Sequence, residues 1–103
     1  MLSDLEYALT QTGLKFAHYG WSKAPSGDYG VYAEDGANYL RADNKSAEKV
    51  VECTVDWFTR NPNSSAPSEI EDAFDSIPCS WSLNSIQFEE DTGFIHYEWI
   101  VQV

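Results

Sequence analysis

The chain has 103 residues, 17 of them acidic and 6 basic, so its formal net charge is −11. This length predicts one domain, and a hydrophobic content of 43% is ordinary for a folded protein. So few basic residues argue against direct binding of DNA or an anionic membrane, because phosphate contacts need Lys and Arg. The apolar runs are too short to span a bilayer. The first residues lack the features of a secretory signal, which predicts synthesis in the cytoplasm.

The N-terminal segment predicts a helix followed by a strand. Ser3 and Glu6 have the spacing of a capping box, and Gly13 is a typical C-terminal stop, so we expect a helix at residues 3–12. Residues 14–19 alternate between apolar and polar side chains and predict a strand.

A polar loop, a strand and a turn follow. Residues 20–28 contain Gly, Pro and Ser and predict a loop, in which Trp21 is conspicuous. We interpret Trp21 either as a hydrophobic plug that folds back on the core or as a contact residue for a partner. Residues 29–33 predict a strand, and residues 34–37 predict a turn because Asp-Gly is a hairpin signature. Residues 38–42 are expected to form a short return strand.

The longest predicted strand covers residues 48–60. Alternation gives it one apolar face and one mixed face, which is typical of an antiparallel sheet with one covered side. The apolar face would carry Val51, Cys53, Val55 and Trp57, and the mixed face Val50, Glu52, Thr54, Asp56 and Phe58.

A second helix is expected to begin near Pro67, which is tolerated in a first turn. Ser68 and Glu71 have capping-box spacing, and Pro78 would end the helix. Its apolar stripe would consist of Ile70, Ala73, Phe74 and Ile77.

The C-terminal segment predicts a two-stranded hairpin. Strands are expected at residues 80–89 and 94–103, joined by a turn with Gly93 at the strained position. In the first of these strands we expect Trp81, Leu83 and either Ile86 or Phe88 to point inward. Together the elements predict an α+β domain spanning residues 1–103, with a mostly antiparallel four- to five-stranded sheet and two helices packed on one face.

The sequence contains no pattern that predicts catalysis or cofactor binding. His18 and His96 are the only histidines, and their separation makes a metal site with Glu98 a weak hypothesis. The two cysteines, Cys53 and Cys79, are expected to be buried free thiols. We therefore predict no catalytic residue, no metal, no cofactor and no enzymatic activity.

Several segments, taken in order, resemble the tail terminator or tail-completion proteins of tailed bacteriophages. The segments are Thr12-Gly13-Leu14, Tyr29-Gly30-Val31-Tyr32, Ala42-Asp43, Trp57-Phe58-Thr59, the helix with Glu69, Ile70, Asp72 and Phe74, and the final strand with Tyr97 and Val101. The resemblance implies a virion structural protein that forms a ring, usually a hexamer, at the head-proximal end of the tail tube. Such a ring stops tube polymerisation and enables head–tail joining. The implied partners are further copies of the chain, the tail tube protein and the head–tail connector, while DNA would pass through the ring.

Loops commonly carry functional contacts, so residues 20–28 and 33–47 are the expected contact segments. The candidate interface residues are Trp21, Asp28, Tyr39, Arg41, Phe58 and Arg60. An alternative function left open by the charge is a small acidic inhibitor that mimics DNA and occupies a basic site on a nucleic-acid enzyme.

Overall fold

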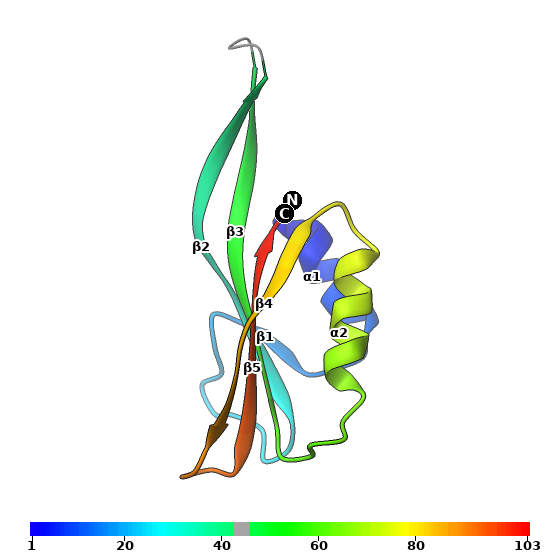
Figure 1. Ribbon diagram of the computed structural model, residues 1–103, viewed down its shortest axis with the longest axis vertical. Helices are drawn as coiled ribbons and strands as arrows, with labels where there is room; N and C mark the ends of the chain where they lie inside the picture. The colour runs from blue at the N-terminus through cyan, green and yellow to red at the C-terminus, as the bar shows by residue number, and fades with distance from the viewer. Residues whose placement is uncertain (43–45) are drawn as a thin grey trace.

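The computed structural model describes the backbone of residues 1–42 and 46–103, and the side chains of residues 1–37 and 50–103. Five strands form one sheet, and both helices lie on the same side of it (Figure 1). The elements are α1 (Leu2–Gln11), β1 (Phe16–His18), β2 (Tyr29–Ala42), β3 (Ser46–Thr59), α2 (Ala66–Asp75), β4 (Ser80–Glu89) and β5 (Phe94–Gln102). The predicted α+β class and the mostly antiparallel sheet are confirmed.

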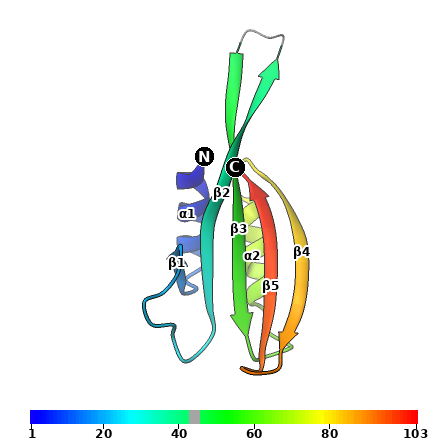
Figure 2. The same cartoon turned by 90° about the vertical axis from the view of Figure 1, so that its left-hand side faces the viewer.

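The strands follow the order β1-β2-β3-β5-β4, so β3 is central and β1 and β4 are the edges (Figure 2). The β1–β2 pair is parallel, and the other pairs are antiparallel. β5 pairs with β3 only between Glu52 and Thr59, whereas β2 accompanies β3 as far as Ser46. The far part of the β2–β3 hairpin therefore projects beyond the body of the domain as a two-stranded ribbon (Figure 1).

The core lies between the sheet and the two helices, where the predicted apolar face of β3 is buried. Alternate residues of β3 and β5 point to this side because side chains of a strand alternate between its two faces. Apolar stripes of α1 and α2 cover them. The core includes Leu5, Leu9, Cys53, Val55, Trp57, Ile70, Phe74, Trp99 and Val101.

Residues 34–37 do not form the predicted hairpin turn. β2 runs through them and keeps its pairing with β3, with a bulge between Glu34 and Gly36. The long β3 offers a continuous partner, so the extra residue, Asp35, is accommodated in a bulge rather than reversing the chain. The Asp35 carboxylate accepts a hydrogen bond from Thr54 Oγ1 at 2.5 Å. The chain break predicted at Asp43–Asn44–Lys45 lies outside the described residues.

Both predicted capping boxes are wrong. The first helix begins at Leu2, and the α-amino group of Met1 donates to the Asp4 carboxylate at 3.1 Å. In α2 the N-cap is Ser65, so Ser68 already lies within the first turn. Glu71 is free to accept a hydrogen bond from Trp99 Nε1 instead, at 2.9 Å.

The predicted strand at residues 14–19 is shorter than expected, since β1 contains only Phe16–His18. Its Phe16 ring packs against Trp57 at a centroid distance of 5.4 Å and lies directly over Gly30. The Phe16 ring fits in this position because residue 30 is a glycine. A Cβ atom on residue 30 would collide with the Phe16 ring.

The apolar residues of β4 lie on the helix side of the sheet, but of these only Trp81 packs against the core. The Trp81 ring packs on Phe74 of α2 at 5.7 Å. Leu83, Ile86 and Phe88 remain 42%, 54% and 65% exposed. Leu83 lies on the helix side of the sheet, as predicted, because it pairs with the buried Trp99, but it is not fully covered there.

We expect Gly30→Ala to destabilise the protein by roughly 1–3 kcal/mol, the usual cost of overpacking a filled core. Gly36→Ala is the matched control, because it lies in the same strand and a Cβ there meets nothing within 4 Å. Urea unfolding of both variants measures the difference. Equal midpoints for the two variants would contradict the Phe16–Gly30 packing.

Candidate functional site: the open face of the sheet

The face of the sheet opposite the helices carries no helix, and we call it the open face (Figure 2). The cross-strand register brings three rows of side chains together on it. The rows are Tyr29, Phe58 and His96, then Val31, Asp56 and Glu98, then Ala33, Thr54 and Ile100. One end of the open face is thus aromatic and the middle is acidic.

The aromatic end is a cluster formed by Trp21, Tyr29, Phe58, Phe94 and His96. Phe58 stacks on Tyr29 at 4.8 Å and on His96 at 4.3 Å. Phe94 meets Tyr29 and Phe58 edge-on at 5.6 and 6.0 Å. Trp21 contacts Tyr29 edge-on at 6.4 Å. Such offset and edge-on pairs add to the stability given by buried area, so this cluster is a small second core.

Arg60 holds the aromatic cluster together from its outer side. Its guanidinium lies 3.9 Å from the Phe94 ring centroid, in cation–π geometry. Its Nε donates to the Thr92 carbonyl at 2.9 Å, and its Nη1 donates to the Ser26 carbonyl at 3.2 Å. Arg60 therefore joins the 20–28 loop to the β4–β5 turn while remaining exposed.

The structure brings together three of the six predicted interface residues, namely Trp21, Phe58 and Arg60. Asp28 lies at the same end, where its carboxylate accepts a hydrogen bond from Thr59 Oγ1 at 2.8 Å. Tyr39 and Arg41 belong to the projecting part of β2, and their side chains lie outside the described residues.

Trp21 folds back on the sheet, as the plug interpretation predicts, while a contact with a partner stays a prediction. Its Nε1 donates to the Gly30 carbonyl at 2.9 Å, and its side chain is partly buried. The interface residues predicted from the sequence did not include Tyr29, Phe94 or His96. The signal was the alternation that places Phe94 and His96 on one face of the last strand, combined with the pairing of that strand with β3.

The acidic middle of the open face contains a network of carboxylates around His96. Asp56 and Glu98 lie directly opposite each other in the β3–β5 register, an arrangement that repels unless a positive group is near. His96 Nε2 lies 2.7 Å from Asp56, and its Nδ1 lies 3.6 Å from Glu89. Asn84 donates to Glu98 at 2.9 Å. Burial raises the pKa of Asp56.

Ligand atoms of Asp56, His96 and Glu98 lie within 4.8 Å of one another, close enough for a metal ion. Metal binding requires a free lone pair on a ring nitrogen of the histidine. Both ring nitrogens of His96 face carboxylates, Nε2 in a hydrogen bond with Asp56 and Nδ1 3.6 Å from Glu89, so both already have partners within the molecule. The geometry favours a structural ion-pair network over a metal site.

A second network surrounds His18. The His18 ring stacks on Tyr19 at 3.9 Å and on Tyr32 at 4.7 Å. Its Nε2 pairs with Glu34, and its Nδ1 lies 4.0 Å from Glu6. The Tyr19 hydroxyl donates to Glu34 at 3.0 Å, and the Tyr32 hydroxyl donates to Glu6 at 2.6 Å. Hydrogen bonding from His18 lowers the pKa of Glu34, while burial and the bond to Glu6 raise the pKa of Tyr32.

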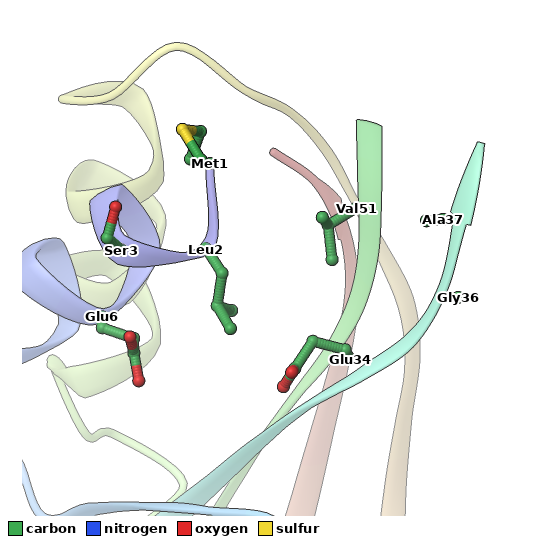
Figure 3. Close-up of a pocket in the computed structure, with 8 residues that line it drawn as sticks. All are labelled: Met1, Leu2, Ser3, Glu6, Glu34, Gly36, Ala37 and Val51. Atoms are coloured by element: carbon green, nitrogen blue, oxygen red, sulfur yellow. The ribbon is translucent and has the colours of Figure 1, made fainter. Parts of the chain in front are cut away.

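Glu6 and Glu34 also line a pocket of about 590 Å³ between the start of α1 and the base of the β2–β3 hairpin. Their carboxylates point into the same space, with Leu2 and Val51 forming apolar walls (Figure 3). Both carboxylates already accept hydrogen bonds from His18 or tyrosine hydroxyls. The polar groups of this pocket are therefore already hydrogen-bonded within the molecule, and neither carboxylate is set up as a general acid or base.

Both cysteines are free thiols, as predicted, but only Cys53 is buried, whereas Cys79 is partly buried. Burial raises the pKa of Cys53 to about 11 and also raises the pKa of Cys79. The Cys79 thiol donates to the Phe74 carbonyl at 3.2 Å. Neither thiol is therefore activated as a nucleophile.

No protein-family model matches the chain, and comparison with curated proteins finds no similar sequence. The resemblance to phage tail-completion proteins therefore stays a prediction. Within the described residues, no helix has the length and apolar character needed to cross a membrane.

We expect Glu34→Gln to weaken the pH dependence of stability in acid. The pKa of Glu34 is lowered from its ordinary 4.5, so its ionised form stabilises the fold above that pH. This contribution is lost as the pH falls through the lowered pKa. The difference in unfolding free energy between wild type and Glu34→Gln should therefore shrink on acidification. Chemical denaturation across that range measures it, with Glu90→Gln in the exposed turn as the control. A difference that does not change with pH would contradict the His18–Glu34 pairing.

Proposed function

We propose that this protein is a phage virion structural protein, a tail terminator or tail-completion protein that forms a ring at the head-proximal end of the tail tube. The observation that carries the proposal is the gathering of Trp21, Phe58 and Arg60 at one end of the open face. Phe58 lies in a segment that carries the phage resemblance, and Trp21 lies in the 20–28 loop, one of the expected contact segments. Together with the 20–28 loop they form a mixed aromatic and cationic surface, the composition typical of protein interfaces.

The shape of the domain supports an assembly role. The projecting β2–β3 hairpin extends away from the body, at the opposite end of β3 from the aromatic cluster (Figure 2). A protein that caps a tube needs separate surfaces for the tube and for the next component. A closed ring repeats one heterologous contact, so each contact in it can be modest.

The charge of the chain supports the same role. A net charge of −11 would make the wall of a DNA passage repel DNA, which favours transit over sticking. Asp35, Asp56 and Glu98 add negative groups to the open face.

The alternative, an acidic DNA mimic, receives less support from the side-chain contacts. A mimic needs an array of free carboxylates that replaces phosphates. Here Asp28, Glu34, Asp56, Glu71 and Glu98 accept hydrogen bonds from side chains of the same molecule. Stoichiometric binding to a nucleic-acid enzyme would favour the mimic, and ring formation would favour the tail protein.

Electron microscopy of the purified protein, alone and mixed with tail tubes that lack a terminator, tests the proposal. We expect rings at one end of the tubes and an end to tube elongation. Tubes that elongate normally, with no ring at either end, would contradict it.

We further expect deletion of residues 22–24 to block head–tail joining while leaving the fold intact. These residues are exposed, whereas the loop anchors Trp21, Ser26 and Asp28 are retained. Circular dichroism and thermal unfolding check the fold, and counting joined particles checks the function. A normal yield of infectious particles, or an unfolded variant, would contradict this role for the loop.

A further inference from the structure

β4 is an edge strand whose outer backbone has no partner strand within the sheet. Natural proteins protect such edges with charged residues, especially Lys, with Pro, or with bulges. Residues 80–88 contain neither Pro nor any charged residue, although the whole chain carries −11. The one protective device present is a bulge between Leu83 and Ser85.

That bulge changes which side chains share a face. Without it, strict alternation would place Leu83 and Ile86 on opposite faces. With it, Leu83 pairs with Trp99 and Ile86 pairs with Tyr97, two residues apart on β5, so both lie on the helix side. Trp81 and Phe88, two residues further out in each direction, lie on this side as well. Of this apolar row, Leu83, Ile86 and Phe88 are 42%, 54% and 65% exposed.

The apolar row is symmetric about the midpoint between Asn84 and Ser85. Turning β4 by a two-fold rotation about that midpoint places Leu83 opposite Ile86 and Trp81 opposite Phe88. We propose that β4 pairs antiparallel with β4 of a second copy about this axis, joining two sheets into one. The partner is a second copy of this chain because the apolar row of one copy matches the same row of the other after the two-fold rotation. A two-fold contact requires this self-complementarity.

The backbone of β4 obeys the same symmetry. Trp99 and Tyr97 are two residues apart, so their N–H and C=O groups point to the same edge of β5. Their partners Leu83 and Ile86 therefore also direct their N–H and C=O groups to the same edge of β4. An unbulged strand could not do this about a midpoint between two residues, because neighbouring residues alternate in the direction of their N–H and C=O groups. The bulge thus makes the symmetric pairing possible in both hydrogen bonding and side-chain direction.

The polar side of β4 also avoids repulsion in this register. Ser82 would face Gln87 of the second copy, and Ser80 would face Glu89. No two like charges are opposed across the axis, while the long-range repulsion between two chains of −11 remains. We therefore expect a small interface that dissociates on dilution and strengthens when salt screens this repulsion.

This dimer does not rest on the proposed tail function, since a ring uses a heterologous contact and this pairing is isologous. Sedimentation equilibrium of wild type, Leu83→Lys and Ile86→Glu tests it, with Tyr7→Lys as the control. Tyr7 is 66% exposed on α1, which lies beside β1 and β2 at the other edge of the sheet from β4 (Figure 2). Each β4 variant should halve the assembled mass of the wild type, from twice 11.6 kDa to 11.6 kDa if the dimer is the whole assembly, whereas Tyr7→Lys should retain the wild-type mass.

A mixture of the two monomeric variants tests the register itself. Lys at position 83 of one chain would face Glu at position 86 of the other, so the 1:1 mixture should restore the dimer although neither variant forms it alone. A wild type that stays monomeric up to millimolar concentration, or an assembly that Ile86→Glu leaves unchanged, would overturn the proposal. A six-fold ring that Ile86→Glu leaves intact would overturn the dimer and leave the tail function standing.

Discussion

The structure depends on the two unlike faces of β3. One face of this central strand carries Cys53, Val55 and Trp57, which are at most 2% exposed. Burying these side chains requires a cover, and α1 and α2 supply it from a single side of the sheet. The hydrophobic effect therefore sets the two-layer arrangement and at the same time leaves the opposite face of the sheet without helices.

Two polar networks, that of His96 on the open face and that of His18 on the helix side, show how an acidic chain places polar groups on a sheet. Both histidines lie between carboxylates, His96 beside Asp56 and Glu89, and His18 beside Glu34 and Glu6. In each network the carboxylates have hydrogen-bond or ion-pair partners within the molecule. Among the residues whose side chains the structure describes, the aromatic end with Arg60 and the edge of β4 are two surfaces suited to protein contacts.

Most of the fold could be predicted from the sequence because apolar and polar side chains alternate strongly along its strands. β4 was predicted with its correct bounds, and β3 and β5 to within two residues, since each repeats apolar side chains with a period of two. The two bulges were not predictable in this way. Asp35–Gly36 is a strong turn signal, and only the length of β3 shows that the chain continues through it. Leu83, Ile86 and Phe88 are exposed because the helices do not cover them. The alternation of a strand predicts which face a side chain lies on, but not whether a helix covers that face.

The candidate site was predictable in part. Phe58 was found because it is apolar on the mixed face of the long strand, and Trp21 because it is conspicuous in a polar loop. The His18 network depends on the parallel β1–β2 pairing, which brings His18 beside Tyr32, and local sequence does not specify that pairing. The link to phage tails comes from the resemblance alone.

The central claim is that this protein acts by associating with other protein chains, including its own copies. Light scattering of the wild type over a concentration series tests the claim most directly. We predict a mass that exceeds the chain mass of 11.6 kDa and rises with concentration. A mass equal to one chain at every concentration, in low and high salt alike, would contradict it.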